Sequence, residues 1–181
     1  MEYCPNTLTS YIFGKKTKKK KVRKDIAEIK RLFIQCAKGL NYLHDKDVLH
    51  RDVKPENILI DYNGNCKLCD FNVTKTLKDG FAKTQVGTPL YTAPEVYTGN
   101  YNMAADVWSL CATFYEIFNG EPPYMKPGID NPHALALSKM DPKNFVPLDH
   151  KQCPDKYFRK VLNLALSTKP DDRMKIKVII N

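Results

Sequence analysis

A polar turn separates two short apolar runs and leaves this part of the chain few ways to fold. Residues 58–60 read Ile-Leu-Ile, residues 66–69 read Cys-Lys-Leu-Cys, and Asn63-Gly64 lies between them. Asn-Gly is a strong signal for a tight turn between antiparallel strands, so we expect a β-hairpin here. Because Asp52 and Asp70 flank the two runs, the hairpin brings their carboxylates to one cleft.

Four longer segments repeat apolar residues every three or four positions, which is the pattern of a helix with one buried face. These segments are residues 25–44, 104–118, 157–166 and 172–180. Asp25 suits the positive end of the first helix, and Asn119-Gly120 ends the second. The prolines that follow Gly120 predict an irregular stretch. The whole pattern predicts a mainly α (α+β) domain in which a small β-hairpin displays the chemistry.

Length and composition are those of one ordinary soluble domain. The chain has 181 residues, 43% of them apolar, and no apolar run approaches the ~18 residues that a membrane span needs. Six cysteines without a secretory leader indicate thiols in a reducing compartment rather than disulfides. We therefore expect a cytoplasmic or nuclear protein.

The positive charge of the chain is local. The net charge is +9, and eight Lys and Arg side chains lie between Lys15 and Lys24, so the remainder is nearly neutral. Such a run repels itself, which favours a charged surface insertion. The alternatives are a nuclear-localisation signal read by an import receptor, or a contact for an acidic partner such as a lipid, a nucleic acid or an acidic substrate. The run has no aromatic residue to stack on bases, which speaks against a nucleic-acid-binding protein.

Three polar motifs follow one another along the chain. His50-Arg51-Asp52 is followed after four residues by Asn57, and Asp70-Phe71-Asn72 and Ala93-Pro94-Glu95 come later. In order and residue type they resemble the catalytic loop, the metal-binding loop and the end of the activation segment of eukaryotic serine/threonine protein kinases. The resemblance implies a protein-kinase-like C-terminal lobe, with the hairpin carrying the catalytic and metal-binding loops and the N-terminal β-lobe absent.

The resemblance implies a catalytic role for the polar residues of these motifs. Asp52 matches the catalytic base that orients and deprotonates a substrate hydroxyl, and Lys54 matches the lysine that neutralises the transferring phosphate. Asn57 and Asp70 match the two protein ligands of Mg²⁺, an ion that prefers oxygen donors. Thr88 matches the hydroxyl residue that contacts the catalytic Asp and Lys. The implied cofactors are ATP and Mg²⁺, and the implied substrate is a protein Ser or Thr hydroxyl.

The first residues resemble the hinge that binds adenine in this family. Met1 falls on the gatekeeper position, and the backbone carbonyl of Glu2 and amide of Cys4 would bind the adenine edge. Leu59 would form the floor beneath the ring. The other nucleotide-binding residues that the resemblance implies are Lys54, Asn57 and Asp70.

Further matches are structural. His50 matches a buried histidine that stacks near the position of Phe71, and Asp106 matches the aspartate that supports the catalytic loop from behind. Glu95 matches a glutamate that pairs with a distant buried arginine, and Arg173 fits that role. Such a pair would tie the substrate platform to the helical body.

Two residues are candidates for regulation. Thr84 lies in the activation segment as the candidate for activating phosphorylation, with a solvated threonine as the alternative, and Arg51 would accept the phosphate through bidentate bonds.

Asn72 stands where the family usually has glycine, and Asn tolerates positive φ best among the other residues. Residues 83–95 look closest to the NIMA-related and autophagy-initiating kinases.

The resemblance covers the chain as a partial kinase domain. Residues 1–6 match the hinge, residues 14–24 form a lysine-rich insertion, and residues 25–181 match the C-terminal lobe. No Gly-x-Gly-x-x-Gly sequence occurs, so the glycine-rich loop and the ATP-anchoring lysine are not among these 181 residues. We therefore interpret the chain as a truncated serine/threonine kinase domain. The rival hypotheses are a catalytically inactive kinase-like interaction module (a pseudokinase or a fragment) and an adaptor built on the basic run.

Overall fold

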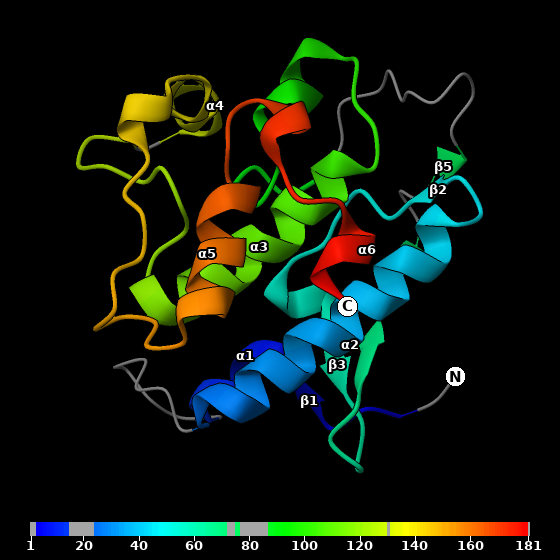
Figure 1. The fold of residues 1–181 in the computed structure, drawn as a ribbon. Coiled ribbons are helices and arrows are strands. Elements are labelled where there is room, and N and C mark those ends of the chain that lie inside the picture. Colours follow the sequence, from blue (N-terminus) through cyan, green and yellow to red (C-terminus); the bar gives the residue numbers. More distant parts are fainter. Residues whose placement is uncertain (1–2, 15–23, 72–74, 77–86, 130, 181) are drawn as a thin grey trace.

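The computed structural model describes residues 3–14, 24–71, 75–76, 87–129 and 131–180, which form a mainly α fold beside a small sheet. Its body is built from the long helices α2 (Ile26–His44), α3 (Ala104–Asn119) and α5 (Lys156–Ala165). Helix α3 lies at the centre and packs against both α2 and α5 (Figure 1). None of the described helices is long and apolar enough to cross a membrane.

Helix α2 occupies the segment predicted from the sequence. The Asp25 carboxylate caps it by accepting a 2.8 Å hydrogen bond from the Glu28 amide. The apolar face is buried, and the Phe33 ring meets Phe114 of α3 edge-on, with ring centroids 5.1 Å apart. Such burial of an apolar face supplies most of the stability of a helix in a protein.

Helix α3 forms the core of the molecule, and it confirms the helix that the sequence predicted over residues 104–118. It is buried on almost every side, and the side chains of Trp108 and Phe114 have no exposed surface. Gly120 ends the helix with a φ of 86°, a left-handed conformation that costs other residues about 1–2 kcal/mol. Helix α3 is therefore the packing centre of the helical body.

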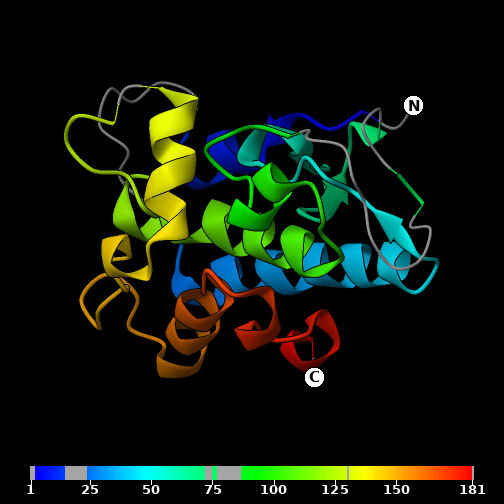
Figure 2. The same cartoon turned by 90° about the horizontal axis from the view of Figure 1, so that it is seen from above.

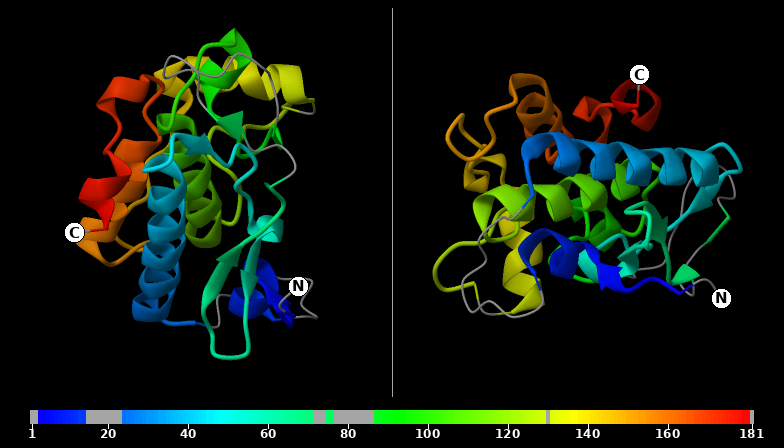
Figure 3. Two further views of the ribbon diagram at one scale, coloured as in Figure 1. Left: turned by 90° about the vertical axis from the view of Figure 1, so that its right-hand side faces the viewer. Right: turned by 90° about the horizontal axis from the view of Figure 1, so that it is seen from below.

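The predicted hairpin is confirmed. The strands are β1 (Asn6–Thr7), β2 (Val48–Leu49), β3 (Ile58–Ile60), β4 (Cys66–Leu68) and β5 (Lys75–Thr76). Strands β3 and β4 pair antiparallel with Ile58 opposite Leu68, and β1 joins the free edge of β3. The hairpin runs alongside α2 (Figure 3). A separate antiparallel pair joins β2 to β5.

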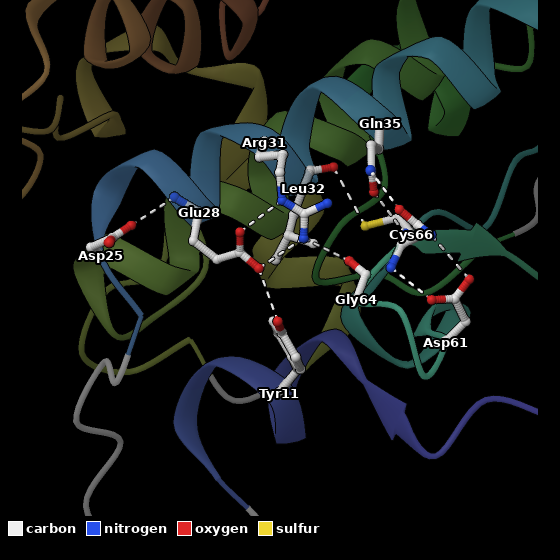
Figure 4. Close-up of polar contacts among 10 residues, drawn as sticks. Tyr11, Asp25, Glu28, Arg31, Leu32, Gln35, Asp61, Gly64 and Cys66 are labelled. Atoms are coloured by element: carbon white, nitrogen blue, oxygen red, sulfur yellow. Dashed lines mark hydrogen bonds and ion pairs between the residues drawn. The ribbon is translucent and has the colours of Figure 1, made fainter.

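Side chains of α2 hold the closed end of the hairpin (Figure 4). Arg31 donates a 2.7 Å hydrogen bond to the Gly64 carbonyl, and the Gln35 side chain accepts a 2.8 Å bond from the Cys66 amide. Within the turn, the Asp61 carboxylate accepts two backbone amide bonds of 2.9 and 2.8 Å. These contacts fix the hairpin against α2, and with it the two loops at its open end.

Two helices were not predicted, the short α1 (Leu8–Phe13) and the longer α4. Helix α4 (Pro132–Met140) lies in the stretch that the prolines predicted to be irregular. Asn131 caps it by accepting a 2.9 Å bond from the Ala134 amide, and Pro132 fits the first turn, where no backbone donor is needed. The short elements of the described chain are α1 (Leu8–Phe13), η1 (Pro55–Asn57), η3 (Pro94–Thr98), η4 (Pro142–Asn144) and η5 (Pro170–Asp172).

The last predicted helix is shorter than expected. The sequence predicts a helix over residues 172–180, but only α6 (Ile176–Ile179) is helical. The reason is that Arg173 has an extended backbone, with φ −79° and ψ 146°, and its side chain turns inward to a buried ion pair. A tertiary contact has here overridden a local helical pattern.

Candidate active site

Asp52, Lys54 and Thr88 form one hydrogen-bonded cluster. The Lys54 Nζ donates to Asp52 Oδ2 at 2.6 Å and to Thr88 Oγ1 at 2.9 Å. Thr88 donates from its backbone amide and from its Oγ1 to Asp52 Oδ1, each at 2.9 Å. The cluster therefore places a carboxylate and an ammonium at one point, with a hydroxyl holding the carboxylate from a distant segment of the chain.

The Asp52 carboxylate is held in its charged form. Burial alone would raise its pKa, but hydrogen bonds from Lys54 and Thr88 outweigh burial, and the pKa lies below its ordinary value. At neutral pH the carboxylate therefore accepts hydrogen bonds and does not donate them. Such a group can orient an incoming hydroxyl.

Asn57 and Asp70 bring oxygen donors beside this cluster. The buried Asn57 side chain donates its Nδ2 to the Asp52 carbonyl at 2.8 Å and to Asp52 Oδ2 at 3.1 Å, which turns its amide oxygen the other way. The Cys69 amide donates to the Asn57 carbonyl at 3.0 Å, so the exposed Asp70 that follows lies next to Asn57. An amide oxygen and a carboxylate suit Mg²⁺, and these two residues fit the predicted magnesium site.

Asp106 on α3 supports the loop that carries Asp52. Its buried carboxylate accepts 2.9 Å bonds from the backbone amides of His50 and Arg51, and the Nε2 of His44 lies 2.9 Å from it. Burial alone would raise the pKa of Asp106, but these bonds outweigh it and the pKa is lowered. Arg51 has a φ of 74°, so the carboxylate braces the loop at a strained residue.

His50 joins the two loops to each other. Its side chain is fully buried, its Nε2 lies 3.1 Å from the Cys69 carbonyl, and its ring lies 5.2 Å from the ring of Phe71. Asp70, between Cys69 and Phe71, has a φ of 64°, a conformation that few residues other than glycine adopt. The loops of Asp52 and Asp70 are thus held in one fixed arrangement.

The ion pair implied for Glu95 and Arg173 is present. The Arg173 guanidinium meets both carboxylate oxygens of Glu95, at 2.5 and 2.8 Å, and also donates to the carbonyls of Ser167 and Ala104. Its carbon centre lies 4.7 Å from the centre of the Trp108 ring. The pair therefore links the segment after Thr88 to the core helix α3.

Two residues of the proposed nucleotide end lie on or beside the strands of the small sheet. Leu59 lies half-buried on β3, next to β1, and Cys4 is half-buried just before β1. Burial raises the pKa of the Cys69 thiol, and the nearness of Asp70 and Cys4 raises it further. Cys4 therefore lies close to the loop that carries Asp70.

Some predicted residues lie outside the described part of the chain. These are Met1, Glu2, Asn72, Thr84 and the basic run as far as Arg23.

Sequence reasoning missed three residues of the site. His44 and Lys139 carry no local signal, because their partners are a carboxylate 62 positions away and a set of backbone carbonyls. Gly87 has a φ of 106°, and a Cβ there would lie 2.7 Å from the Arg51 carbonyl oxygen. Only glycine fits at this position. The one clue in the sequence was that Gly87 stands directly before Thr88.

Comparisons with known proteins agree with this geometry. The family model described as the protein kinase domain matches residues 1–181. The MAP kinase kinase MKK1/SSP32 of Saccharomyces cerevisiae is 49% identical over 87 residues, which are 48% of this chain and 17% of that protein. The serine/threonine-protein kinase ste20 of Aspergillus fumigatus is 40% identical over 139 residues, 75% of this chain and 16% of that protein. The MAP kinase kinase skh1/pek1 of Schizosaccharomyces pombe is 36% identical over 138 residues, 76% of this chain and 38% of that protein.

The chain is thus similar to these proteins over a limited part of their length. It spans 38% of the fission-yeast relative and less of the other two.

Proposed function

The chain belongs to the protein kinase family, and from this membership we propose that it forms the C-terminal lobe of a kinase domain that transfers phosphate from ATP to protein Ser and Thr hydroxyls. Residues 1–6 would be its hinge and residues 25–181 the lobe. The relatives named as a serine/threonine-protein kinase and as MAP kinase kinases support a protein substrate. The likeness of residues 83–95 to NIMA-related and autophagy-initiating kinases stays a prediction.

The observation that carries this proposal is the cluster of Asp52, Lys54 and Thr88. Phosphoryl transfer is catalysed mainly by positioning and by charge neutralisation. The charged Asp52 would accept the hydrogen bond of the substrate hydroxyl and take its proton, while Lys54 would offset negative charge on the phosphate. Thr88 bonds Asp52 through two donors and accepts from Lys54, so it would keep both groups aligned.

ATP and Mg²⁺ are the proposed cofactors. Asn57 and Asp70 would hold the metal ion, which neutralises phosphate charge when it is bound. Leu59 and the backbone of Glu2 and Cys4 would hold the adenine ring. Residues upstream of the hinge pattern would be needed to cover the phosphates in any complete kinase domain.

The test is phosphate transfer from γ-labelled ATP to Ser- and Thr-containing peptides. We expect Asp52→Asn to lower the rate of transfer by about 100-fold or more, because the variant cannot take the proton. The control is Asp171→Asn, which removes an exposed carboxylate of η5 outside the cluster and should keep the wild-type rate. Full activity in Asp52→Asn would contradict the proposal.

An outcome without transfer would favour the interaction-module hypothesis. A wild-type protein that is folded and binds partners, but transfers no phosphate, would be a kinase-like module without turnover. The basic run between Lys15 and Lys24 remains a proposed contact for an acidic partner or an import receptor, and a cytoplasmic or nuclear location remains a proposal with it. Deleting residues 15–24 and following the protein in cells tests both.

A further inference from the structure

Lys139 is a charged side chain in the interior of the protein. It lies near the end of α4, which runs crosswise to α2 and α3 (Figure 2), and it has no exposed surface. Lysine is almost never fully buried unless its ammonium is compensated. Burial lowers the pKa of Lys139 to about 7, so the interior disfavours the charged form.

Three backbone carbonyls compensate the ammonium. The Lys139 Nζ donates to the carbonyl oxygens of Pro89, Leu90 and Thr92, at 2.5, 3.1 and 2.9 Å. An ammonium has three N–H donors, so each donor has one acceptor. A methionine of similar length would fill this space without the cost of burying a charge, so what lysine adds here is the three hydrogen bonds.

The three carbonyls belong to the turn that begins at Thr88. The backbone amides of Tyr91 and Thr92 donate to the Thr88 carbonyl at 2.9 and 3.1 Å, and Thr92 Oγ1 donates to it at 2.8 Å. Thr88 is also the residue that bonds Asp52 through its amide and its hydroxyl. A single turn of chain therefore connects Lys139 to the catalytic carboxylate.

We propose that Lys139 is a positioning residue that holds the turn of residues 88–92 in the conformation in which Thr88 bonds Asp52. The proposal rests on the proposed function, because this turn would support the substrate around its acceptor hydroxyl. Leu90, whose carbonyl is held, is 37% exposed as a residue and would contact the substrate. Lys139 would thus set the affinity for the protein substrate without touching it.

The kinetic test is the variant Lys139→Met, which keeps the length of the side chain and removes the donors. We expect KM for a peptide substrate to rise and kcat to fall, together lowering kcat/KM by between about 10- and 100-fold, while KM for ATP stays unchanged. The matched control is Lys143→Met, which removes an exposed lysine of the neighbouring η4. Peptide kinetics equal to wild type in Lys139→Met, or an equal change in KM for ATP, would overturn the proposal.

A second readout does not need catalysis. In amide hydrogen exchange we expect Lys139→Met to speed exchange at Thr88, Tyr91 and Thr92, while amides of the hairpin exchange as in the wild type. Equal exchange in the two proteins would overturn the proposal. If the wild type transfers no phosphate, the proposed function fails, but the exchange result still decides whether Lys139 holds the turn.

A third measurement needs no variant, so it stands even if Lys139→Met does not fold. NMR of the wild-type lysine ammonium groups, recorded below pH 7 where Lys139 is charged, should show a slowly exchanging signal for Lys139, with couplings across hydrogen bonds to the carbonyl carbons of Pro89, Leu90 and Thr92. A rapidly exchanging Lys139 signal without such couplings would overturn the proposal.

Discussion

At the scale of single residues, Asp52 owes its charge to two neighbours. Burial works against ionisation, while Lys54 and Thr88 together more than offset it. The charged form is present above the lowered pKa and is lost as the pH falls through that value. The proposed activity should therefore be lost at low pH, and the pH at which it is lost should depend on Lys54 and Thr88, because they set the pKa of Asp52.

The variant Lys54→Met tests this dependence. Without the ammonium, the pKa of Asp52 should rise, so the acid limb of the profile of kcat/KM against pH should move to higher pH. At neutral pH the rate should fall by about 100-fold or more, because charge on the phosphate is no longer offset. Lys38→Met, at an exposed position of α2, should change neither quantity. An acid limb that does not move in Lys54→Met would contradict this account of Asp52.

The sequence predicted those site residues whose contacts are set by spacing and by the hairpin. Asp52, Asn57 and Asp70 are brought together because the hairpin folds back on itself. His44 and Lys139 could not be predicted in the same way. Tertiary packing brings these side chains to their partners. Every residue has a backbone carbonyl, so the sequence does not show which carbonyls accept the hydrogen bonds of Lys139.

At the scale of elements, local sequence signals correctly predicted helix boundaries and the hairpin turn. The Asp25 cap, the Asn63-Gly64 turn and the Gly120 stop each occur where the structure has a boundary or a turn. Helix α4 was missed because its prolines were interpreted as breakers, although Pro132 lies in the first turn, where proline is tolerated. The final helix was predicted too long because Arg173 is held by tertiary contacts.

The link between α3 and the loop that carries Asp52 is tested by Asp106→Asn. This buried carboxylate accepts two backbone amides of the loop, and hydrogen bonds to a charged group contribute about 1.5–3 kcal/mol. We expect the free energy of unfolding at neutral pH to fall by about that amount, in urea denaturation. In the wild type this contribution is lost as the pH falls through the lowered pKa of Asp106, so the two proteins should converge in acid. A loss in the variant no larger than in Asp171→Asn would contradict the assigned role.

At the scale of the whole molecule, the buried ion pair of Glu95 and Arg173 connects η3, which follows Thr88, to the helical body. The side chain of Arg173 is 1% exposed and that of Glu95 is 10% exposed. The pair also contacts Trp108 and carbonyls on two other segments. Removal of one partner would leave an uncompensated buried charge.

The variant Arg173→Met should therefore lower the free energy of unfolding by about 3–5 kcal/mol. The matched control is Lys30→Met, which breaks a half-exposed pair with Asp155 and should cost about 1 kcal/mol or less. In the double variant Glu95→Gln/Arg173→Met, the loss should be smaller than the sum of the two single losses. Equal costs for Arg173→Met and Lys30→Met would show that the pair does not hold the molecule together.

Asn57 and Asp70 are proposed as the metal end of a nucleotide site. Calorimetric titration of ATP into the protein, with and without Mg²⁺, measures whether they act in this way. We predict binding that requires Mg²⁺, weakens in Asp70→Ala and is unchanged in Asp171→Asn. Absence of binding at millimolar ATP, or binding that is the same in Asp70→Ala and in the wild type, would contradict the claim.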